Sequence, residues 1–410
     1  MFFYPAKMAL PNFNEVDGEK WAVIACDQFT SDPTYWEKCA EFIEDHPSTL
    51  NLILPEVYLN GDVKKRIEAI NSKMKGYEKS VFVNTPHIYM LVERVQSDGR
   101  VRVGLVGKID LEDYSFAPDA QTPIRSTEGT VAERIPPRVR IRKDATYELP
   151  HVMLLVDDPA MSVIEPLLKE EYPEAYRFPL MQGGGSIRGV TVPQEKAEQI
   201  DKALRACVKK CGEGNELYMA VGDGNHSLAT AKTIYEQMKK KDPSVRETSP
   251  ARYALVELVN LHSPALTFEP IYRVVTGIKD QQAFFTEFAS FACACALDEA
   301  CAQNGAQKIT CLFGNMEQSV TFPHGAHSLA VGTVQKFLDA HEGLEVDYIH
   351  DKDALRALAC REDSFGFLFD GMSKEELFPA VVKDGPLPRK TFSMGHARDK
   401  RYYVEARKIK

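Results

Sequence analysis

The sequence predicts an α/β or α+β fold in which mixed sheets are flanked by helices. Strand-like and helix-like segments alternate along all 410 residues, and no internal repeat or low-complexity tract interrupts them. The composition, 44% hydrophobic and 27% charged, is that of an ordinary globular protein. A chain of this length suggests two or three domains, and it can bury a large core without disulfides or structural metals.

The N-terminal α/β region, residues 1–116, begins this alternation. Apolar residues at helical spacing predict its helices, and Ser97-Asp98-Gly99-Arg100 suits a hairpin turn between two β-rich stretches. In chain order, the expected elements are a strand at Trp21–Cys26, helices at Thr34–His46 and Val63–Tyr77, and strands at His87–Val95 and Arg102–Asp110.

The core region, residues 117–276, combines a basic loop with further alternation. Segment 125–143 holds six Lys or Arg against two Glu, a net charge of 6 − 2 = +4. The expected elements are a strand at His151–Asp157, a helix at Met161–Tyr172, a glycine-bent hairpin or loop at Met181–Val192, a helix from Pro193 to about Lys210, a strand at Leu217–Val221, a helix at His226–Lys241, and a strand or helix at Arg252–Leu261.

The C-terminal α/β region, residues 277–410, ends in a basic tail. Residues 384–410 hold eight Lys or Arg against three acids, a net charge of 8 − 3 = +5, so the tail either solubilises the protein or returns to the core. Ser373 and Glu376 form a capping-box pattern. The expected elements are strands at Asp347–His350 and Phe365–Phe369, helices at Asp353–Ala359 and Ser373–Val382, and a final strand within Arg401–Ile409.

Charge and apolar patterning argue against several classes of function. The formal charge is 50 − 59 = −9, which argues against a general nucleic-acid binder, although a local basic pocket stays open. Apolar runs such as Val152–Val156 are far shorter than the roughly 20 residues of a spanning helix. The N-terminus lacks the pattern of a secretion signal, and nine scattered cysteines predict reduced thiols in a cytoplasm. A homo-oligomer stays open.

Some cysteines lie close enough in sequence to raise the question of zinc. Cys207 and Cys211 would share a helix face, and Cys293, Cys295 and Cys301 form a looser group, with His324 and His327 as further candidate ligands. The segment Phe-Ala-Cys-Ala-Cys-Ala-Leu also has the pattern of small buried residues. Structural cysteines are therefore favoured over a metal site.

The turn after Leu217–Val221 is the most informative unit. A strand, a glycine-rich turn and a helix start form an anion-binding device, since the first helical N–H groups lack partners and the helix dipole is positive there. Asp223 and His226 add a carboxylate and an imidazole that could hold a cation or move a proton. The alternative is an ordinary turn capped by Ser227. The candidate phosphate-binding residues here are Gly222, Gly224, Asn225 and Ser227.

Four ordered blocks across about 270 residues resemble an uncharacterised bacterial and archaeal family, catalogued as domain of unknown function ten-fifteen. Val221-Gly222-Asp223-Gly224-Asn225-His226 is similar to its Asp-Gly-His-His-Arg element. The other blocks are Arg125-Ser126-Thr127-Glu128-Gly129-Thr130, the stretch from Glu257-Leu258-Val259-Asn260 through Phe268-Glu269-Pro270-Ile271-Tyr272-Arg273, and Leu387-Pro388-Arg389-Lys390-Thr391.

The same turn element resembles the ParB and sulfiredoxin superfamily. That superfamily includes chromosome-partition proteins, sulfiredoxins and free-serine kinases, and the resemblance implies that the turn cradles nucleotide phosphates. This chain has Ser227 where the superfamily usually has Arg, and Asn225 in place of the first His. A phosphate-binding guanidinium is therefore missing, and another cation must replace it.

Two segments offer that cation. In the basic loop, Arg125 and Arg134 are candidates, with a solvated, salt-bridged loop as the alternative. In the tail, Arg389, Lys390 and His396 follow a rigid Gly-Pro-Leu-Pro turn. Gly183-Gly184-Gly185 lacks the residues of a nucleotide motif and predicts a bend or a close backbone approach. The isolated histidines, His87, His151 and His262, are expected to be structural.

The sequence therefore predicts a phosphoryl-transfer or phosphate-ester enzyme, kinase-like or phosphatase, acting on a small molecule or nucleotide. Asp223 would hold Mg²⁺ or act with Glu128 as general base, and His226 would donate a hydrogen bond to phosphate. ATP or ADP is the expected cofactor, and the resemblance implies serine or phosphoserine as substrate. A nucleotide-sensing or DNA-associated regulator and a non-catalytic scaffold are the alternatives.

Overall fold

The computed structural model describes residues 1–130, 132–210 and 215–410, which form two compact units. Unit 1 comprises Met1–Ser126, Thr130–Leu266 and Gly395–Lys410, and unit 2 comprises Thr127–Gly129 and Thr267–Met394. The sequence regions 1–116 and 117–276 thus both contribute mainly to unit 1. The basic tail from Gly395 onward belongs to unit 1 as well.

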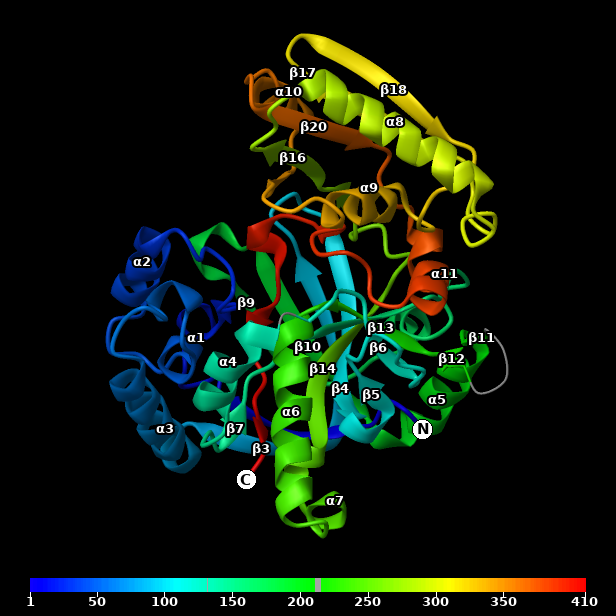
Figure 1. Cartoon of the computed structure of the whole chain (residues 1–410). Helices are drawn as coiled ribbons and strands as arrows, with labels where there is room; N and C mark the ends of the chain where they lie inside the picture. Colours follow the sequence, from blue (N-terminus) through cyan, green and yellow to red (C-terminus); the bar gives the residue numbers. More distant parts are fainter. Residues whose placement is uncertain (131, 211–214) are drawn as a thin grey trace. The chain divides into compact units, whose positions relative to one another are not determined.

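Among the described residues, unit 1 contains a mixed ten-stranded sheet, which agrees with the predicted fold class (Figure 1). Strand β1 (Ala6–Pro11) pairs with β3, off the main path. The main path runs in the order β5 (Tyr114–Ser115), β6 (Ile124–Ser126), β13 (Met219–Asp223), β8 (Met153–Val156), β14 (Tyr253–Asn260), β4 (Val101–Asp110), β3 (Phe82–Val95), β10 (Ser186–Pro193) and β9 (Glu174–Pro179).

Both faces of this sheet are buried. Alternate residues of a strand point to opposite faces, and Tyr89 and Leu91 accordingly belong to one hydrophobic cluster while Met90 and Val92 belong to the other. The predicted hairpin around Gly99 is confirmed, with Val95 paired to Val101. A sheet covered on both faces leaves its strand ends as the places where polar side chains can gather.

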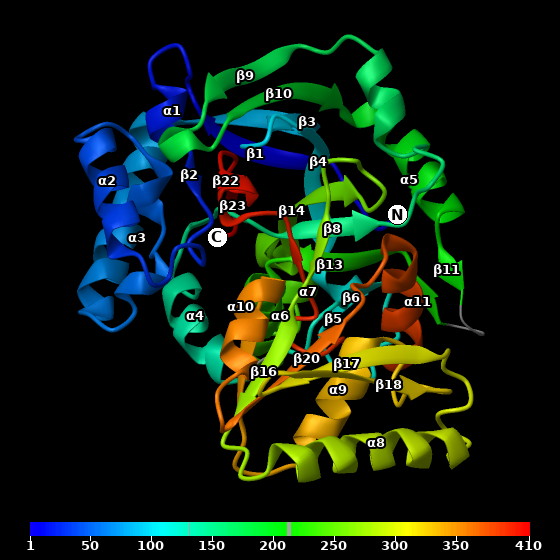
Figure 2. The same ribbon diagram turned by 90° about the horizontal axis from the view of Figure 1, so that it is seen from above.

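The helices of unit 1 cover these two faces (Figures 1 and 2). Helices α2 and α3 pack into the cluster that contains Met90, and α5 and α6 pack into the cluster that contains Leu91. The bounds are α1 (Gly18–Trp21), α2 (Pro33–Ile43), α3 (Val63–Ser80), α4 (Ile135–Arg142), α5 (Ala197–Ala206), α6 (Asn225–Lys241) and α7 (Val245–Thr248).

The C-terminal tail forms part of unit 1 and lies beside the N-terminal segment, as Figure 2 shows for β22 and β2. Strand β22 (Tyr402–Tyr403) pairs with β2 (Val23–Ile24), and β23 (Arg407–Lys408) pairs with β7 (Tyr147–Glu148). The Trp21 indole N–H also donates to the Val404 carbonyl at 3.0 Å. The predicted final strand is therefore two short strands. Their pairing brings together residues that lie far apart in the sequence.

A buried ion network anchors this tail. Arg401 donates to Glu257 Oε2 and to Glu405 Oε2, both at 2.7 Å, and to the Pro150 carbonyl at 2.6 Å. Gly104 makes room for the Glu257 side chain, because a Cβ there would lie 2.2 Å from Glu257 Oε1. Charged groups removed from water need such partners.

Acid should weaken unit 1 through its buried carboxylates. Burial alone would raise the pKa of Glu257, but Arg102 and Arg401 hold it below its usual range. A carboxyl with a lowered folded-state pKa stabilises the fold above its unfolded pKa, and that stability is lost as pH falls through the folded pKa. We expect the free energy of unfolding to fall below about pH 4.3, the pKa of a free Glu.

Urea unfolding between neutral and acid pH measures this effect. The variant Glu257→Gln should show a smaller fall with pH than the wild type, because its side chain no longer titrates. An unfolding free energy of the wild type that stays constant down to about pH 3, below the ordinary Glu pKa, would contradict the argument.

Unit 2 has a smaller sheet of its own. In the described residues, five antiparallel strands lie in the order β18 (Met316–Phe322), β17 (Gln307–Phe313), β20 (Ser364–Phe369), β16 (Tyr272–Thr276) and β19 (Glu345–Ile349). Strands β15 (Phe268–Pro270) and β21 (Phe392–Met394) form a separate pair. The helices are α8 (Gln281–Leu297), α9 (Ala330–Asp339), α10 (Lys352–Ala359) and α11 (Lys374–Asp384), and the capping box of Ser373 and Glu376 is confirmed.

One predicted helix is wrong, and one glycine prediction is confirmed. Met161–Tyr172 contains only a short 3₁₀ turn, Glu165–Lys169, because Met161 takes a positive φ of 53° and the Asp158 carboxylate accepts from the Ser162 and Val163 amides. Gly185 is a close backbone approach, since a Cβ there would lie 2.1 Å from the Val95 carbonyl oxygen.

The cysteines of the described residues are free thiols. Cys295, Cys301 and Cys311 are buried, whereas Cys293 is exposed, and Cys211 lies outside the described residues. No group of three or more His, Cys, Asp or Glu that could hold a metal ion occurs in the part of the chain that the structure describes. In that same part, no helix is long and apolar enough to cross a membrane.

Candidate functional site

The strand-turn-helix predicted around Asp223 is present in unit 1. Strand β13 ends at Asp223, Gly224 adopts a left-handed conformation with φ 79°, and α6 begins at Asn225. A Cβ at Gly224 would lie 3.0 Å from Val152 Cα and 3.4 Å from His151 Cδ2. Glycine is therefore favoured twice here, by the left-handed backbone conformation and by the close packing against Val152.

We expect Gly224→Ala to lower the free energy of unfolding by about 1–2 kcal/mol, the cost of a left-handed conformation for a residue with a Cβ. Urea unfolding measures it. Gly76→Ala is the matched control, because Gly76 lies inside α3 and a Cβ added there would meet no atom within 4 Å, so that substitution should be neutral or stabilising. Equal stability of Gly224→Ala and the wild type would contradict this account.

The turn presents the positive end of α6. Gly224 is the N-cap residue and makes no side-chain capping hydrogen bond. The Asp223 carboxylate accepts from the Gly224 amide at 2.9 Å, which holds the turn. Such a helix start attracts anions through its dipole and its N–H groups.

Behind the turn lies a chain of polar contacts formed by Tyr403, His151 and Asp27. The Tyr403 hydroxyl lies 2.7 Å from His151 Nδ1, and His151 Nε2 lies 3.4 Å from Asp27 Oδ2. Asp27 also accepts from Gln28 Nε2 at 3.0 Å. These residues come together because β2, which leads into Asp27, pairs with β22, which carries Tyr403. His151 lies two residues before β8, whose N-terminal end lies beside the end of β13.

The basic tail reaches the turn through Lys400. Its Nζ lies 3.6 Å from Asp223 Oδ2, a loose ion pair in which both side chains are less than one-fifth exposed. Lys400 also acts electrostatically on Asp27. Lys400 thus pairs with Asp223 and lowers the pKa of Asp27, and it brings a positive charge from the tail to the turn within unit 1.

A third carboxylate, Glu56, completes the surroundings of His151. It pairs with Arg138 of α4, and its backbone amide donates to the Cys26 carbonyl at 2.9 Å. Burial, offset in part by Arg138, raises the pKa of Glu56. Arg138, one of the arginines of the basic loop, is therefore bound to the rim of this group of residues.

The charges shift the titration of the central pair in a consistent way. Burial would raise the pKa of Asp27, but the His151 imidazole and Lys400 hold it below its usual range. Burial would lower the pKa of His151, but Asp27, Asp223 and Glu56 raise it. Asp27 is accordingly a carboxylate at neutral pH, poised beside an imidazole that holds its proton more tightly than usual.

The side chains around the turn differ in how much of their surface is exposed to solvent. The side chains of Asp27, Asp223 and Lys400 are 27%, 18% and 15% exposed, whereas His151 is 8% exposed and Tyr403 is buried. Asp27, Asp223 and Lys400 are thus partly exposed to solvent, whereas His151 and Tyr403 are buried. We call the five residues the turn cluster.

The predicted residues of the basic loop have different places. Arg125 is buried in β6, and its guanidinium donates to the Thr122 carbonyl at 2.9 Å and to Asn215 Oδ1 at 2.5 Å. Its neighbour Ser126 donates to Asn225 Oδ1 at 2.5 Å, so the Asn225 side chain ties β6 to α6. Arg134 is exposed at the end of a 3₁₀ turn, and its carbonyl accepts from Arg138.

Three predicted residues belong to unit 2. Glu128 forms a bridge with Leu387, and the carbonyls of Arg389 and Lys390 accept from the Arg273 guanidinium at 2.7 and 3.0 Å. The remaining one, His396, belongs to unit 1, is exposed, and precedes the 3₁₀ turn Ala397–Asp399. Within unit 1, Asp223 of this turn pairs with Lys400, and Gly224 lies against Val152 and His151.

The donor set suits Mg²⁺ shared with phosphate oxygens. Mg²⁺ is usually held by one or two carboxylates together with substrate phosphates and water. Asp223, at the end of β13 and next to the start of α6, would hold the ion, and the ion would neutralise phosphate charge.

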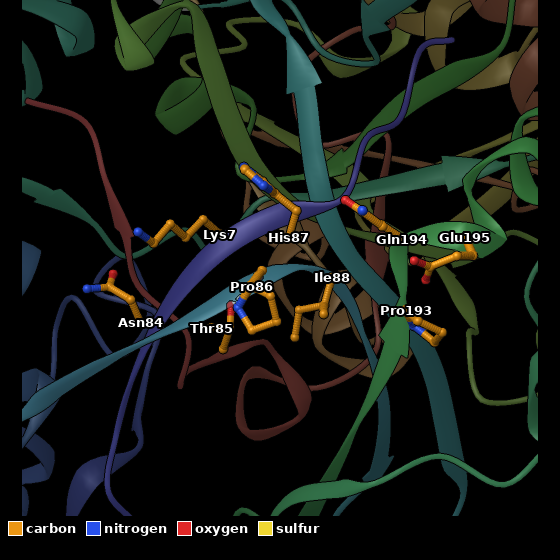
Figure 3. A pocket seen from close by; sticks show the side chains of 9 residues that line it. All are labelled: Lys7, Asn84, Thr85, Pro86, His87, Ile88, Pro193, Gln194 and Glu195. Carbon is orange, nitrogen blue, oxygen red and sulfur yellow. Dashed lines mark hydrogen bonds between the residues drawn. The ribbon is translucent and has the colours of Figure 1, made fainter.

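A shallow pocket elsewhere in unit 1 shares no residue with the turn cluster (Figure 3). It lies where β1, β3 and the end of β10 meet. Lys7 and His87 are its basic residues, and Lys7 and Lys108 add to burial in lowering the pKa of His87. It is lined by Lys7, Asn84, Thr85, Pro86, His87, Ile88, Pro193, Gln194 and Glu195.

Residues 10–342 match the family described as protein of unknown function DUF1015, and the chain belongs to that family. No curated protein sequence matches the chain.

Several solved structures are distantly similar. A conserved hypothetical protein from Pyrococcus furiosus is 14% identical with a TM-score of 0.34, covering 71% of this chain and 90% of its own. Free serine kinase in complex with AMP is 14% identical with a TM-score of 0.36, covering 74% and 90%. SbnI with a C-terminal truncation, from Staphylococcus aureus, is 9% identical with a TM-score of 0.34, covering 71% and 82%. Free serine kinase also has an ADP complex.

Proposed function

We propose that unit 1 carries a phosphoryl-transfer or phosphate-ester site that acts on a small polar metabolite. One observation carries the proposal: the glycine-capped start of α6 lies beside Asp223 and its partner Lys400, and Asp27 lies next to them across His151. Phosphoryl transfer needs mainly positioning and charge neutralisation, and these groups supply both.

Phosphate would bind at the start of α6. The N–H groups of the first turn and the helix dipole favour an anion there, and Gly224 has no side chain to obstruct its approach. Lys400 would neutralise part of the charge in place of the arginine that the sequence lacks at Ser227. His226 as a hydrogen-bond donor to phosphate, Glu128 as a base, and Arg125, Arg389 and Lys390 as charge partners stay predictions.

The two carboxylates have different parts in this proposal. Asp223, beside Lys400 and the turn, would hold Mg²⁺ with the phosphate oxygens. Asp27, oriented by His151 and Gln28, would accept the proton of the attacking hydroxyl or water. ATP or ADP as nucleotide, and serine or phosphoserine as substrate, are the compounds to test first.

A thermal-shift screen with Mg²⁺ tests binding. We expect ADP, ATP or phosphoserine to raise the midpoint of unfolding, because a ligand of the folded state at a hundredfold excess over its Kd adds about 2.7 kcal/mol. The shift should be lost in Lys400→Met and retained in Lys408→Met, whose lysine belongs to the same tail but pairs with Glu78. No shift with any of these ligands, phosphate or pyrophosphate would count against the proposal.

Turnover gives the second test. Asp223→Asn should abolish activity and keep the fold, because the amide retains the shape of the side chain but loses the charge that holds Mg²⁺. Circular dichroism checks the fold, and a coupled assay for ADP or phosphate checks activity. Full activity of Asp223→Asn would contradict the role assigned to Asp223.

A further inference from the structure

We infer that Tyr403 is a positioning residue, which holds the neutral His151 imidazole with its proton on Nε2 and thereby orients Asp27. The inference rests on the proposed function for its effect on turnover, but the protonated nitrogen of His151 can be measured without any activity. Tyr403 would act on Asp27 through His151, to which its hydroxyl is bonded.

The hydrogen bonds around the Tyr403 hydroxyl define the direction of each donor. The Cys26 backbone N–H donates to the Tyr403 oxygen at 3.2 Å, so this oxygen is an acceptor there. The single hydroxyl proton is then available for His151 Nδ1, which lies 2.7 Å away. The Cys26 thiol lies beside the same hydroxyl, but sulfur is a weak acceptor compared with an imidazole nitrogen.

The protonation state of the Tyr403 phenol supports its role as the donor to His151 Nδ1. Burial, together with the Cys26 thiol and Asp27, raises the pKa of Tyr403 well above its usual value, so the phenol keeps its proton throughout the range in which a protein is stable. A neutral imidazole that accepts at Nδ1 carries its own proton on Nε2. That N–H faces Asp27 Oδ2 at 3.4 Å.

With the proton on Nε2 of His151, two N–H groups point toward the Asp27 carboxylate. Nε2–H of His151 faces one carboxylate oxygen, and Gln28 donates to the other at 3.0 Å. The titratable groups that face His151 come from four segments: Asp27 after β2, Glu56 from the 3₁₀ turn Glu56–Tyr58, Asp223 at the end of β13, and Tyr403 on β22. The buried Tyr403 hydroxyl thus fixes the orientation of the His151 imidazole, and the imidazole in turn orients the partly exposed Asp27 carboxylate.

Nitrogen NMR of selectively ¹⁵N-histidine-labelled full chain tests the inference, at an alkaline pH where His151 is neutral. His151→Gln assigns the resonances. The wild type should show a protonated Nε2 and an unprotonated Nδ1, and Tyr403→Phe should lose this preference. Tyr402→Phe is the matched control, because it removes a neighbouring buried hydroxyl that donates to Met181 instead, and it should keep the wild-type pattern.

Two results would overturn the inference: a wild-type His151 protonated on Nδ1, or an unchanged Nε2–H preference in Tyr403→Phe. For turnover, Tyr403→Phe should lower kcat by about ten- to a hundredfold with little change in KM, the size typical of partners that orient a functional group through a hydrogen bond. The expected NMR pattern without any turnover in the wild type would support the positioning of His151 and count against the proposed function alone.

Discussion

Asp27→Asn is expected to lower kcat by about a hundred- to ten-thousandfold, the usual contribution of a positioned general base. The amide keeps the size of the side chain and can still receive the hydrogen bond from Gln28, but it cannot accept a proton. Because Asp27 is 27% exposed and lies outside the hydrophobic clusters, the fold should persist. Steady-state kinetics and circular dichroism measure the two effects separately.

Asp32→Asn is the control for this substitution. Asp32 caps α2 five residues later in the same segment, and Asn caps helices as well as Asp does, so this variant should match the wild type in activity and stability. Wild-type turnover by Asp27→Asn would remove Asp27 from the mechanism. A loss of turnover accompanied by unfolding would instead show that the residue serves stability.

Arg401→Met is expected to have the largest effect on stability, about 3–5 kcal/mol, the cost of removing one partner from a buried ion network. Glu257 and Glu405 would each lose a hydrogen bond of 2.7 Å in a region closed to water. Arg401 also donates to the Pro150 carbonyl, next to His151, so the variant should lose turnover along with stability. Urea unfolding measures the difference in free energy.

Arg398→Met provides the comparison for this variant. It removes the same charge from the same tail, but its side chain is exposed, and such surface changes usually stay within about 0.5 kcal/mol. The network account predicts a clear difference between the two variants. If both lose the same small amount of stability, the buried network does not anchor the tail.

The local parts of the site follow from the sequence. The strand, the glycine turn and the helix around Asp223 depend on neighbouring residues, and the sequence predicts all three within a few positions. The hairpin around Gly99 and the capping box at Ser373 are equally local. Patterns of this kind succeed because hydrophobic spacing, turn residues and caps act over a few residues.

The partners of the turn cannot be found in this way. Val23 pairs with Tyr403, and this pairing of two very short strands at opposite ends of the chain brings Asp27, Lys400 and Tyr403 to the turn. Neither strand has a pattern that names its partner. Asp27 directly after a predicted strand, and His151 at the start of another, were the available signals, because polar residues at strand ends often gather at one edge of a sheet.

Composition alone does not place the basic segments in the fold. The charge of the loop around Arg125 predicts a phosphate clamp, and that role stays a prediction, while the Arg125 side chain is buried and donates to Thr122 and Asn215. Arg138 and Arg142 pair with Glu56 and Glu148. A count of charges cannot tell which arginines have partners in the fold, and Lys400, inconspicuous in the tail, is the cation that meets the turn.

Phosphorus NMR of the purified protein with ATP, Mg²⁺ and serine tests whether the turn cluster transfers phosphoryl groups. We expect that a phosphate monoester resonance grows as ATP is consumed, or that phosphoserine offered alone releases phosphate, and that Asp27→Asn and Asp223→Asn abolish the conversion. If no phosphorus resonance changes with either mixture, or if both variants convert it as fast as the wild type, the turn cluster is not a phosphoryl-transfer site.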